Sequence, residues 1–140
     1  MDYSRGFGVF FAAFTFGPVI GFLAGGLGTG VADILGGYPH WAPLSILIHG
    51  TQALVAAYIG YRCETVRQVL GWLAGSVIMI GGYFLAEVVL YGKGAAFVEV
   101  PGNTIQAVAG GIIALPLAVA IRRAWPPIDT IALPRTWEER

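Results

Sequence analysis

FGPVIGFLAGGLGTGVADILGGYPHWAPLSILIHGTQALVAAYIGY, residues 16–61, is the stretch that decides the fold of this chain. It contains two apolar runs, Pro18 to Leu35 and Pro43 to Tyr61, separated by a short loop of glycine, aromatic and histidine residues. Each run is long enough to cross a bilayer as a helix, since the rise is about 1.5 Å per residue and the hydrocarbon core about 30 Å thick. The stretch therefore predicts a hairpin of two transmembrane helices.

The rest of the chain has the same apolar character. The 140 residues are 56% hydrophobic and only 11% charged, and the mean hydropathy is +0.73. A soluble domain of this size needs more polar surface than that composition supplies. Two further apolar spans run from Val69 to Tyr91 and from Pro101 to Ile121. We expect an all-α integral membrane protein with four full transmembrane helices and a half-helix before them.

Arginines predict the orientation of these spans. They gather at one end of the predicted helices, at Arg62, Arg67, Arg122 and Arg123. Because cytoplasmic loops are enriched in Lys and Arg, this end is expected to face the cytoplasm. The loops at 36–42 and 92–100 are then external.

The two ends of the chain differ from the long apolar spans. Phe7 to Phe16 would reach only about 15 Å, half the hydrocarbon core, and so predicts a half-helix, a re-entrant piece or the remnant of a longer segment. The arginine rule also predicts a helix before it. Residues 124–140 are polar and interrupted by proline, so we expect a cytoplasmic tail after a transmembrane domain of residues 1–123.

Polar side chains within the spans are the main indication of function. An ionisable group in hydrocarbon costs at least about 2.5 kcal/mol, and it persists only where it faces protein, water or a ligand. Judged by helical rise, such residues lie at the bilayer centre or in its outer half: Asp33, His49, Gln52, Glu87, Asn103 and Gln106. Those three or four residues apart share a helical face: Ser45, His49 and Gln52; Tyr83, Glu87 and Tyr91; Asn103 and Gln106. If these faces converge, they line a pocket open to the outside, capped by Tyr38, His40 and Trp41.

Several of these residues also have a purely structural interpretation. Asp33 is placed to reach the interface, and Tyr38, Trp41 and Tyr91 suit an interfacial aromatic belt. His49 and Glu87 are candidates for ligand contact, with an interhelical hydrogen bond as the alternative. Small residues spaced about four apart allow close helix packing, either within the chain or against another subunit: Gly17, Gly21, Gly25 and Gly28.

Other classes of function lack a motif. Net charge is zero and no basic patch is present, which argues against nucleic-acid binding. No GxxxxGK[ST], HExxH or HxxxH pattern occurs, and neither a nucleophile elbow nor a carboxylate pair can be recognised. Cys63 is the only cysteine, so no disulfide framework or thiolate metal site is expected. We expect no enzymatic activity, no metal and no cofactor.

Three segments carry a resemblance to a known family: GPVIGFLAGGLGTGVADILGGYPHWAP, the HGTQALVAAYIG that follows, and the later PGNTIQAVAGGIIALPLA. Over roughly residues 8–123 the chain resembles the substrate-binding S components of energy-coupling factor (ECF) transporters, which import vitamins and their precursors into prokaryotes. The resemblance implies a multi-pass plasma-membrane protein with both termini in the cytoplasm and a ligand held toward the external side. It also implies two kinds of partner, a transmembrane coupling protein and a pair of ATPases.

Carried onto this chain, the resemblance favours a set of substrate-binding residues: Trp41, His49, Gln52, Tyr83, Glu87, Asn103 and Gln106. A pocket of polar groups among aromatics suits a flat heterocycle, and riboflavin, thiamine and the pyrimidine precursor of thiamine all remain open. The chain departs from the six-helix pattern of the family in one respect, because the first helix has no counterpart here. The alternative function is a small structural or assembly membrane protein that packs through its glycine-rich helix and binds no solute.

Overall fold

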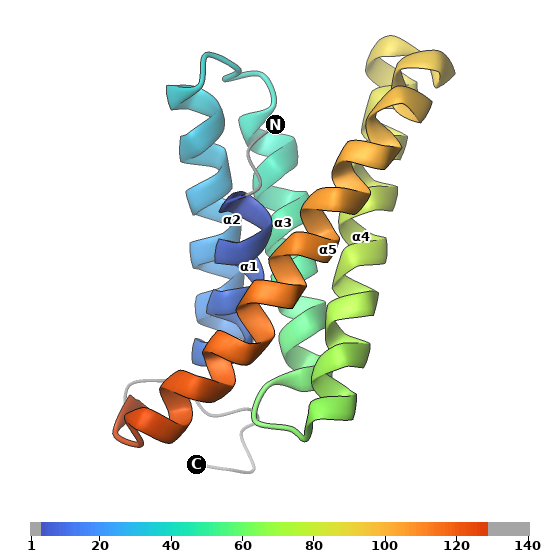
Figure 1. Ribbon diagram of the computed structural model, residues 1–140. Coiled ribbons are helices and arrows are strands. Elements are labelled where there is room, and N and C mark those ends of the chain that lie inside the picture. The colour runs from blue at the N-terminus through green and yellow to red at the C-terminus, as the bar shows by residue number, and fades with distance from the viewer. Residues whose placement is uncertain (1–3, 129–140) are drawn as a thin grey trace.

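The computed structural model describes residues 4–128 of the chain. These residues form helices with the following bounds: α1 Ser4–Phe16, α2 Pro18–Leu35, α3 Ala42–Gly60, α4 Thr65–Tyr91 and α5 Lys93–Ala124. Helices α2 to α5 are each long and apolar enough to cross a membrane (Figure 1). The expected all-helical membrane bundle is therefore confirmed. Residues 129–140, most of the predicted tail, lie outside the described range.

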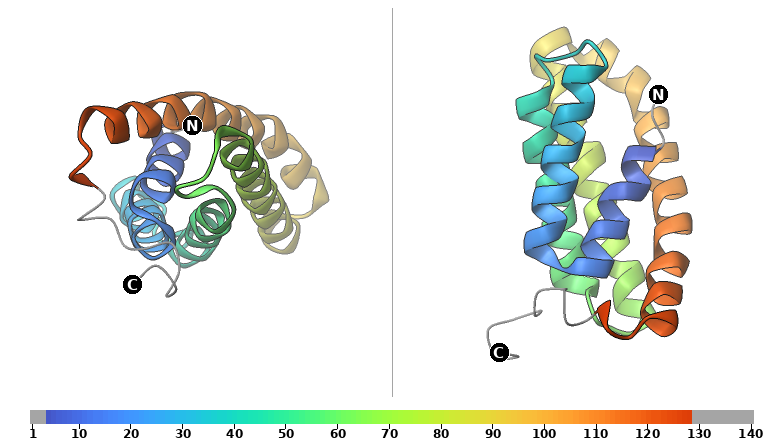
Figure 2. Two further views of the ribbon diagram at one scale, coloured as in Figure 1. Left: turned by 90° about the horizontal axis from the view of Figure 1, so that it is seen from below. Right: turned by 90° about the vertical axis from the view of Figure 1, so that its left-hand side faces the viewer.

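Helix α1 is a short helix held inside the bundle. Its 13 residues span about 20 Å, less than the hydrocarbon core, and it packs against α2, α3 and α5 (Figures 1 and 2). The guanidinium of Arg122 donates to the backbone oxygens of Phe14 and Thr15, at 3.1 and 2.9 Å. Two carbonyls at the end of α1 that have no partner within their own helix are satisfied in this way. The segment is therefore a helix too short to cross the hydrocarbon core, as predicted.

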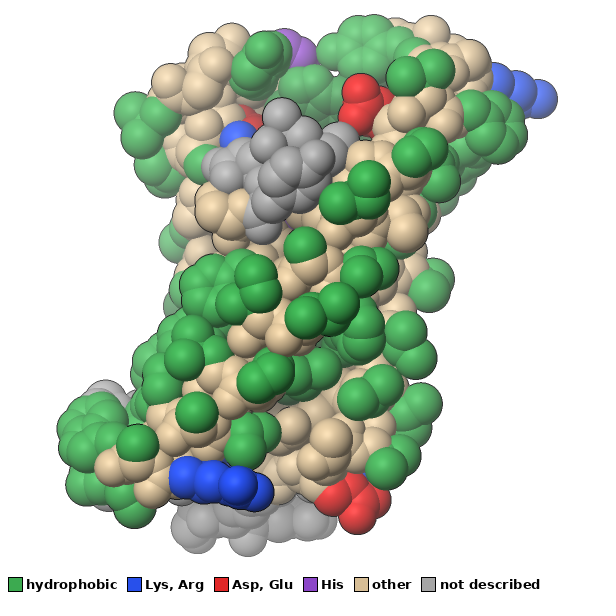
Figure 3. All heavy atoms as spheres, in the orientation of Figure 1, with side chains coloured by type: hydrophobic (Ala, Val, Ile, Leu, Met, Phe, Trp, Pro, Cys, Tyr) green, Lys and Arg blue, Asp and Glu red, His purple; other side chains and the backbone are tan. Residues whose placement is uncertain are grey.

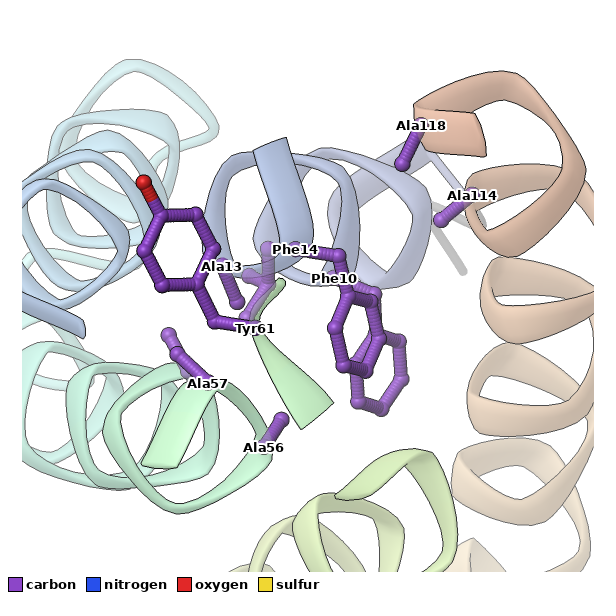
Figure 4. Packing of buried hydrophobic residues seen from close by; sticks show 10 residues of the cluster. Phe10, Ala13, Phe14, Ala56, Ala57, Tyr61, Ala114 and Ala118 are labelled. Atoms are coloured by element: carbon purple, nitrogen blue, oxygen red, sulfur yellow. The ribbon is translucent and has the colours of Figure 1, made fainter. Parts of the chain in front are cut away.

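The apolar core lies where α1 meets α3 and α5. Figure 4 shows Phe10 and Phe14 extending from α1 toward these neighbours, beside Tyr61. Most other members of the core are small: Ala13, Ala53, Ala56, Ala57, Ala114 and Ala118. Inside a bilayer, transfer of apolar groups from lipid to protein contributes little, and close packing of small residues supplies the attraction.

The glycines at the start of α2 and along it lie in three different environments. Gly17 has φ of 96°, a conformation that favours glycine, and makes the turn between α1 and α2. A Cβ on Gly21 would lie 2.9 Å from Cα of Ala13, so this glycine allows α1 and α2 to approach closely, and Gly25 packs beside Val9 of α1. Gly28 differs from the others, because a Cβ there would meet nothing within 4 Å. It makes no close contact with another helix in the described part of the chain.

The prediction of an external loop at residues 92–100 is wrong. Only Gly92 interrupts the helical backbone, with φ of 92°, and α5 begins at Lys93. One residue in this glycine-favoured conformation is enough to reverse the chain. Pro101 removes one backbone hydrogen bond and does not end α5. In place of the predicted loop, the structure has two helical turns, which lie beside α4.

Candidate functional site

A cavity of about 820 Å³ opens at the end of the bundle opposite the arginine-rich loops. Figure 3 shows histidine and acidic side chains at this end, whereas the other end shows basic and acidic side chains. All five helices or their connections contribute to its lining: Arg5, Asp33, Tyr38, Trp41, Ser45, His49, Tyr83, Glu87, Tyr91, Ala95, Val98, Glu99, Asn103 and Gln106. The polar faces predicted on three separate spans therefore converge on one cavity, together with two residues of α1 and α2. Among the seven predicted substrate-binding residues, only Gln52 is outside the lining.

Ser45 and His49 of helix α3 face the cavity. Gln52, on the same helix, contacts His49 and lies outside the cavity lining. Gln52 is completely buried, and its Oε1 atom lies 2.7 Å from Nδ1 of His49. Because an amide oxygen can only accept, Nδ1 of His49 carries the proton, and Nε2 of the neutral ring is then the acceptor. Gln52 thus orients His49 and is not itself placed for ligand contact. Residues three apart on a helix share a face only approximately, so His49 can face the cavity while Gln52 faces away from it.

Aromatic rings form one wall of the cavity. Trp41 has ring centroids of Tyr83 and Tyr91 at 5.7 and 6.0 Å, so a residue of the α2–α3 loop contacts α4 at two levels. Tyr83 also lies 5.5 Å from the ring of His49, and its hydroxyl is 2.7 Å from the hydroxyl of Ser45. These contacts connect α3 to α4 in the wall of the cavity. They also hold flat rings in place for stacking on a planar ligand.

An ion pair closes the side of the cavity formed by α1 and α2. The guanidinium of Arg5 donates to the carboxylate of Asp33, whose side chain is only 5% exposed. The amino-acid sequence placed Asp33 among the polar residues that indicate function, with an interfacial carboxylate as the structural alternative, and did not predict its pairing with Arg5. The signal that could have found the pair was the presence of two opposite charges in the outer half of neighbouring helices.

Carboxylates and amides complete the lining on the α4 and α5 side. Glu87 is 8% exposed, and Gln106 is 6% exposed, whereas Asn103 is half-buried and Glu99 exposed. Glu99 was missed because residues 92–100 were expected to form a loop. The structure places it on the first turns of α5, facing the same cavity as Glu87.

The chemistry available at this site is recognition of a small polar ligand. Ligand pockets have volumes of roughly 300 to 1,000 Å³ and combine aromatic surface with a few oriented polar groups. This cavity offers four aromatic side chains, an oriented histidine, two amides and three carboxylates. Within residues 4–128, no three His, Cys, Asp or Glu side chains come together so as to hold a metal ion.

The chain is similar to known proteins over most of its length. A family model described as "ECF-type riboflavin transporter, S component" matches residues 5–123. A Pyrococcus woesei protein described as "Uncharacterized protein in gap 3'region" is 35% identical over 121 residues, which are 86% of this chain and 81% of that protein. The thiamine precursor transporter HmpT of Lactococcus lactis subsp. cremoris is 29% identical over 116 residues, 83% of this chain. These residues make up 66% of HmpT, just under two thirds of its length.

Proposed function

Because the chain belongs to the family of ECF-type riboflavin transporter S components, we propose that it captures a vitamin or vitamin precursor outside a prokaryotic cell and delivers it for ATP-driven uptake. The observation that carries this proposal is the cavity of about 820 Å³, lined by polar and aromatic side chains from every helix. Polar groups are expensive within a membrane and are retained where they serve a ligand or a pathway. A transmembrane bundle that gathers so many of them around one opening is suited to solute binding.

The proposed orientation places the cavity outside and the arginine-rich end in the cytoplasm. Arg62 lies in the short connection between α3 and α4, Arg67 lies in the first turn of α4, and Arg122 and Arg123 lie in the last turn of α5. All four arginines are therefore at the end away from the cavity. The positive-inside rule then assigns that end, including the start of the tail at residue 124, to the cytoplasm of a multi-pass plasma-membrane protein.

Energy for uptake is proposed to come from partner subunits. The sequence contains no phosphate-binding GxxxxGK[ST] loop, so this chain is proposed to work as a binding subunit and not as an enzyme. The partners would be a transmembrane coupling protein and a pair of ATPases. Gly28 leaves an open position on the outer surface of α2, and close approach of a partner helix is easiest at such a residue.

The ligand is proposed to be a flat heterocyclic vitamin or precursor. The family is named for riboflavin, and the relative HmpT is described as a transporter of a thiamine precursor. Both descriptions concern planar nitrogen heterocycles. Trp41, Tyr83 and Tyr91 supply the rings on which such a ligand would stack, and Asn103 and Gln106 supply donors and acceptors at its edge.

Tryptophan fluorescence of the detergent-purified chain tests the proposal. The titrants are riboflavin, thiamine, the hydroxymethyl aminopyrimidine precursor of thiamine and further vitamins. We expect saturable quenching by one compound, because Trp41 lines the cavity. Trp41→Phe should remove most of the quenching, whereas Trp125→Phe, which changes an exposed tryptophan beyond the other end of α5, should leave it intact.

Uptake provides the second arm of the test. Cells that express the chain with its coupling protein and ATPases should accumulate the same compound, and His49→Ala should lower uptake at unchanged membrane abundance. If no compound of the panel quenches the fluorescence or is accumulated, the transport function is contradicted. A fall in abundance without loss of uptake per molecule would instead favour the structural or assembly function.

A further inference from the structure

Glu87 is a buried carboxylate whose second oxygen has no protein partner. The residue is 8% exposed and lines the cavity, and its Oε2 atom has no hydrogen bond within residues 4–128. Buried polar atoms are nearly always hydrogen-bonded, because a buried polar or charged group without a partner destabilises the fold. An orphan oxygen that faces a ligand cavity indicates that a donor from the ligand completes it.

The charges that line the cavity also favour a ligand that carries a hydrogen-bond donor or a positive charge. Among the described residues, its lining contains three carboxylates, Asp33, Glu87 and Glu99, together with the guanidinium of Arg5 and the imidazole of His49. Arg5 pairs with Asp33 on the opposite side, and neither Glu87 nor Glu99 forms an ion pair within residues 4–128. Glu87 and Glu99 are also close enough to affect each other by like-charge repulsion. Within residues 4–128, the α4 and α5 side of the cavity lining therefore has two carboxylates and no basic side chain.

The aromatic wall favours the same kind of ligand. Trp41, Tyr83 and Tyr91 line the cavity, and the ring centroid of Trp41 lies 5.7 Å from that of Tyr83 and 6.0 Å from that of Tyr91. The faces of these rings are electron-rich and attract a cation, more strongly where water is excluded. A planar ring with positive charge is attracted both by these faces and by the two carboxylates.

On the basis of the proposed function, we propose that the cavity selects a nitrogen heterocycle that presents an amino group or a positive charge to Glu87. Glu87 accepts the hydrogen bond from that group, and Glu99, near the cavity mouth, attracts its charge. A neutral flavin-type ring without such a group is then the weaker ligand. Glu87 is in this sense the residue that determines specificity.

Isothermal titration calorimetry of the full chain in detergent tests this selectivity with three probes. Thiamine carries a permanent positive charge, the hydroxymethyl aminopyrimidine carries an exocyclic amine, and riboflavin is neutral. We expect at least one of the first two probes to bind about tenfold or more tightly than riboflavin, since a hydrogen bond to a charged group contributes about 1.5 to 3 kcal/mol. Glu87→Gln should weaken that probe by about tenfold or more and change riboflavin by less than about twofold.

Two further variants make the test specific. Glu64→Gln makes the same carboxylate-to-amide change at the start of α4, at the far end of the bundle, and should alter no affinity. Glu99→Gln changes an exposed residue, so folding is not at risk, and should weaken only the amine or cation at low salt.

The outcomes separate this inference from the proposed function. Tight riboflavin binding that exceeds both other probes and is unaffected by Glu87→Gln would overturn the selectivity and leave the transport function standing. An equal loss for all three probes in Glu87→Gln would show that Glu87 only supports the fold, and would overturn it as well. Failure of the folded chain to bind any of the three probes would contradict the selectivity directly.

Discussion

The Nδ1 atom of His49 lies 2.7 Å from the Oε1 atom of Gln52, one turn further along α3. His49 faces the cavity and Gln52 does not, so we expect the amide to affect ligand binding only through the histidine. This bond holds the imidazole in one orientation and one tautomer before a ligand arrives.

Gln52→Leu should therefore weaken ligand binding although residue 52 is outside the cavity. The loss of one hydrogen bond that orients His49 is expected to lower affinity by about threefold to tenfold. Calorimetric titration of the wild-type ligand measures the change. Ser76→Ala is the control, since Ser76 bonds only to the backbone oxygen of Trp72 and is absent from the cavity lining. Unchanged affinity in Gln52→Leu would contradict the orienting role.

The Arg5–Asp33 ion pair should couple α1 to α2 energetically. Asp33→Asn removes the negative charge beside a guanidinium that is only 22% exposed, so we expect a marked loss of stability. Arg5→Met combined with Asp33→Asn should restore part of it, with a coupling energy of about 0.5 to 3 kcal/mol. Unfolding by SDS in mixed micelles gives the four free energies of the cycle. Strictly additive effects would show that the pair contributes nothing to the packing of α1.

Two neighbouring glycines of α2 should respond in opposite ways to alanine. A Cβ on Gly26 would lie 2.8 Å from the backbone oxygen of Ile46, so Gly26→Ala forces α2 and α3 apart and should cost about 1 to 3 kcal/mol. Gly28→Ala meets open space and should be neutral or stabilise the helix by up to about 1 kcal/mol. Thermal melting of the purified variants in one detergent compares them. Equal melting temperatures would mean that the helices separate without cost.

Cys63 is a natural probe of the proposed orientation. It is the only cysteine of the sequence and lies in the α3–α4 connection, half-buried, at the arginine-rich end. A membrane-impermeant maleimide should label it in inside-out vesicles and spare it in intact cells. Tyr38→Cys in a Cys63→Ala background, at an exposed site near the cavity mouth, should show the reverse pattern. Labelling of Cys63 from outside would invert the orientation.

Much of the site could be predicted because polar residues in a membrane span are conspicuous. Depth, helical spacing and the family resemblance together favoured His49, Tyr83, Glu87, Asn103 and Gln106, and the structure brings all of them to one cavity. Whether each contacts the ligand stays a prediction. The same reasoning could not separate Gln52 from them, because a spacing of three residues does not tell which member of a pair faces the cavity and which faces a neighbouring helix.

The amino-acid sequence by itself determined the number and the approximate bounds of the long helices. The length and hydropathy of a single segment decide whether it can cross the hydrocarbon core, and neither depends on the rest of the chain. Tertiary structure alone decided that α1 lies within the bundle, that Gly92 turns the chain in one residue, and that Arg5 meets Asp33. Each of these depends on which helix faces pack together, and residues far apart in the chain determine that choice jointly. The cavity belongs to this second group, because no single helix contains it.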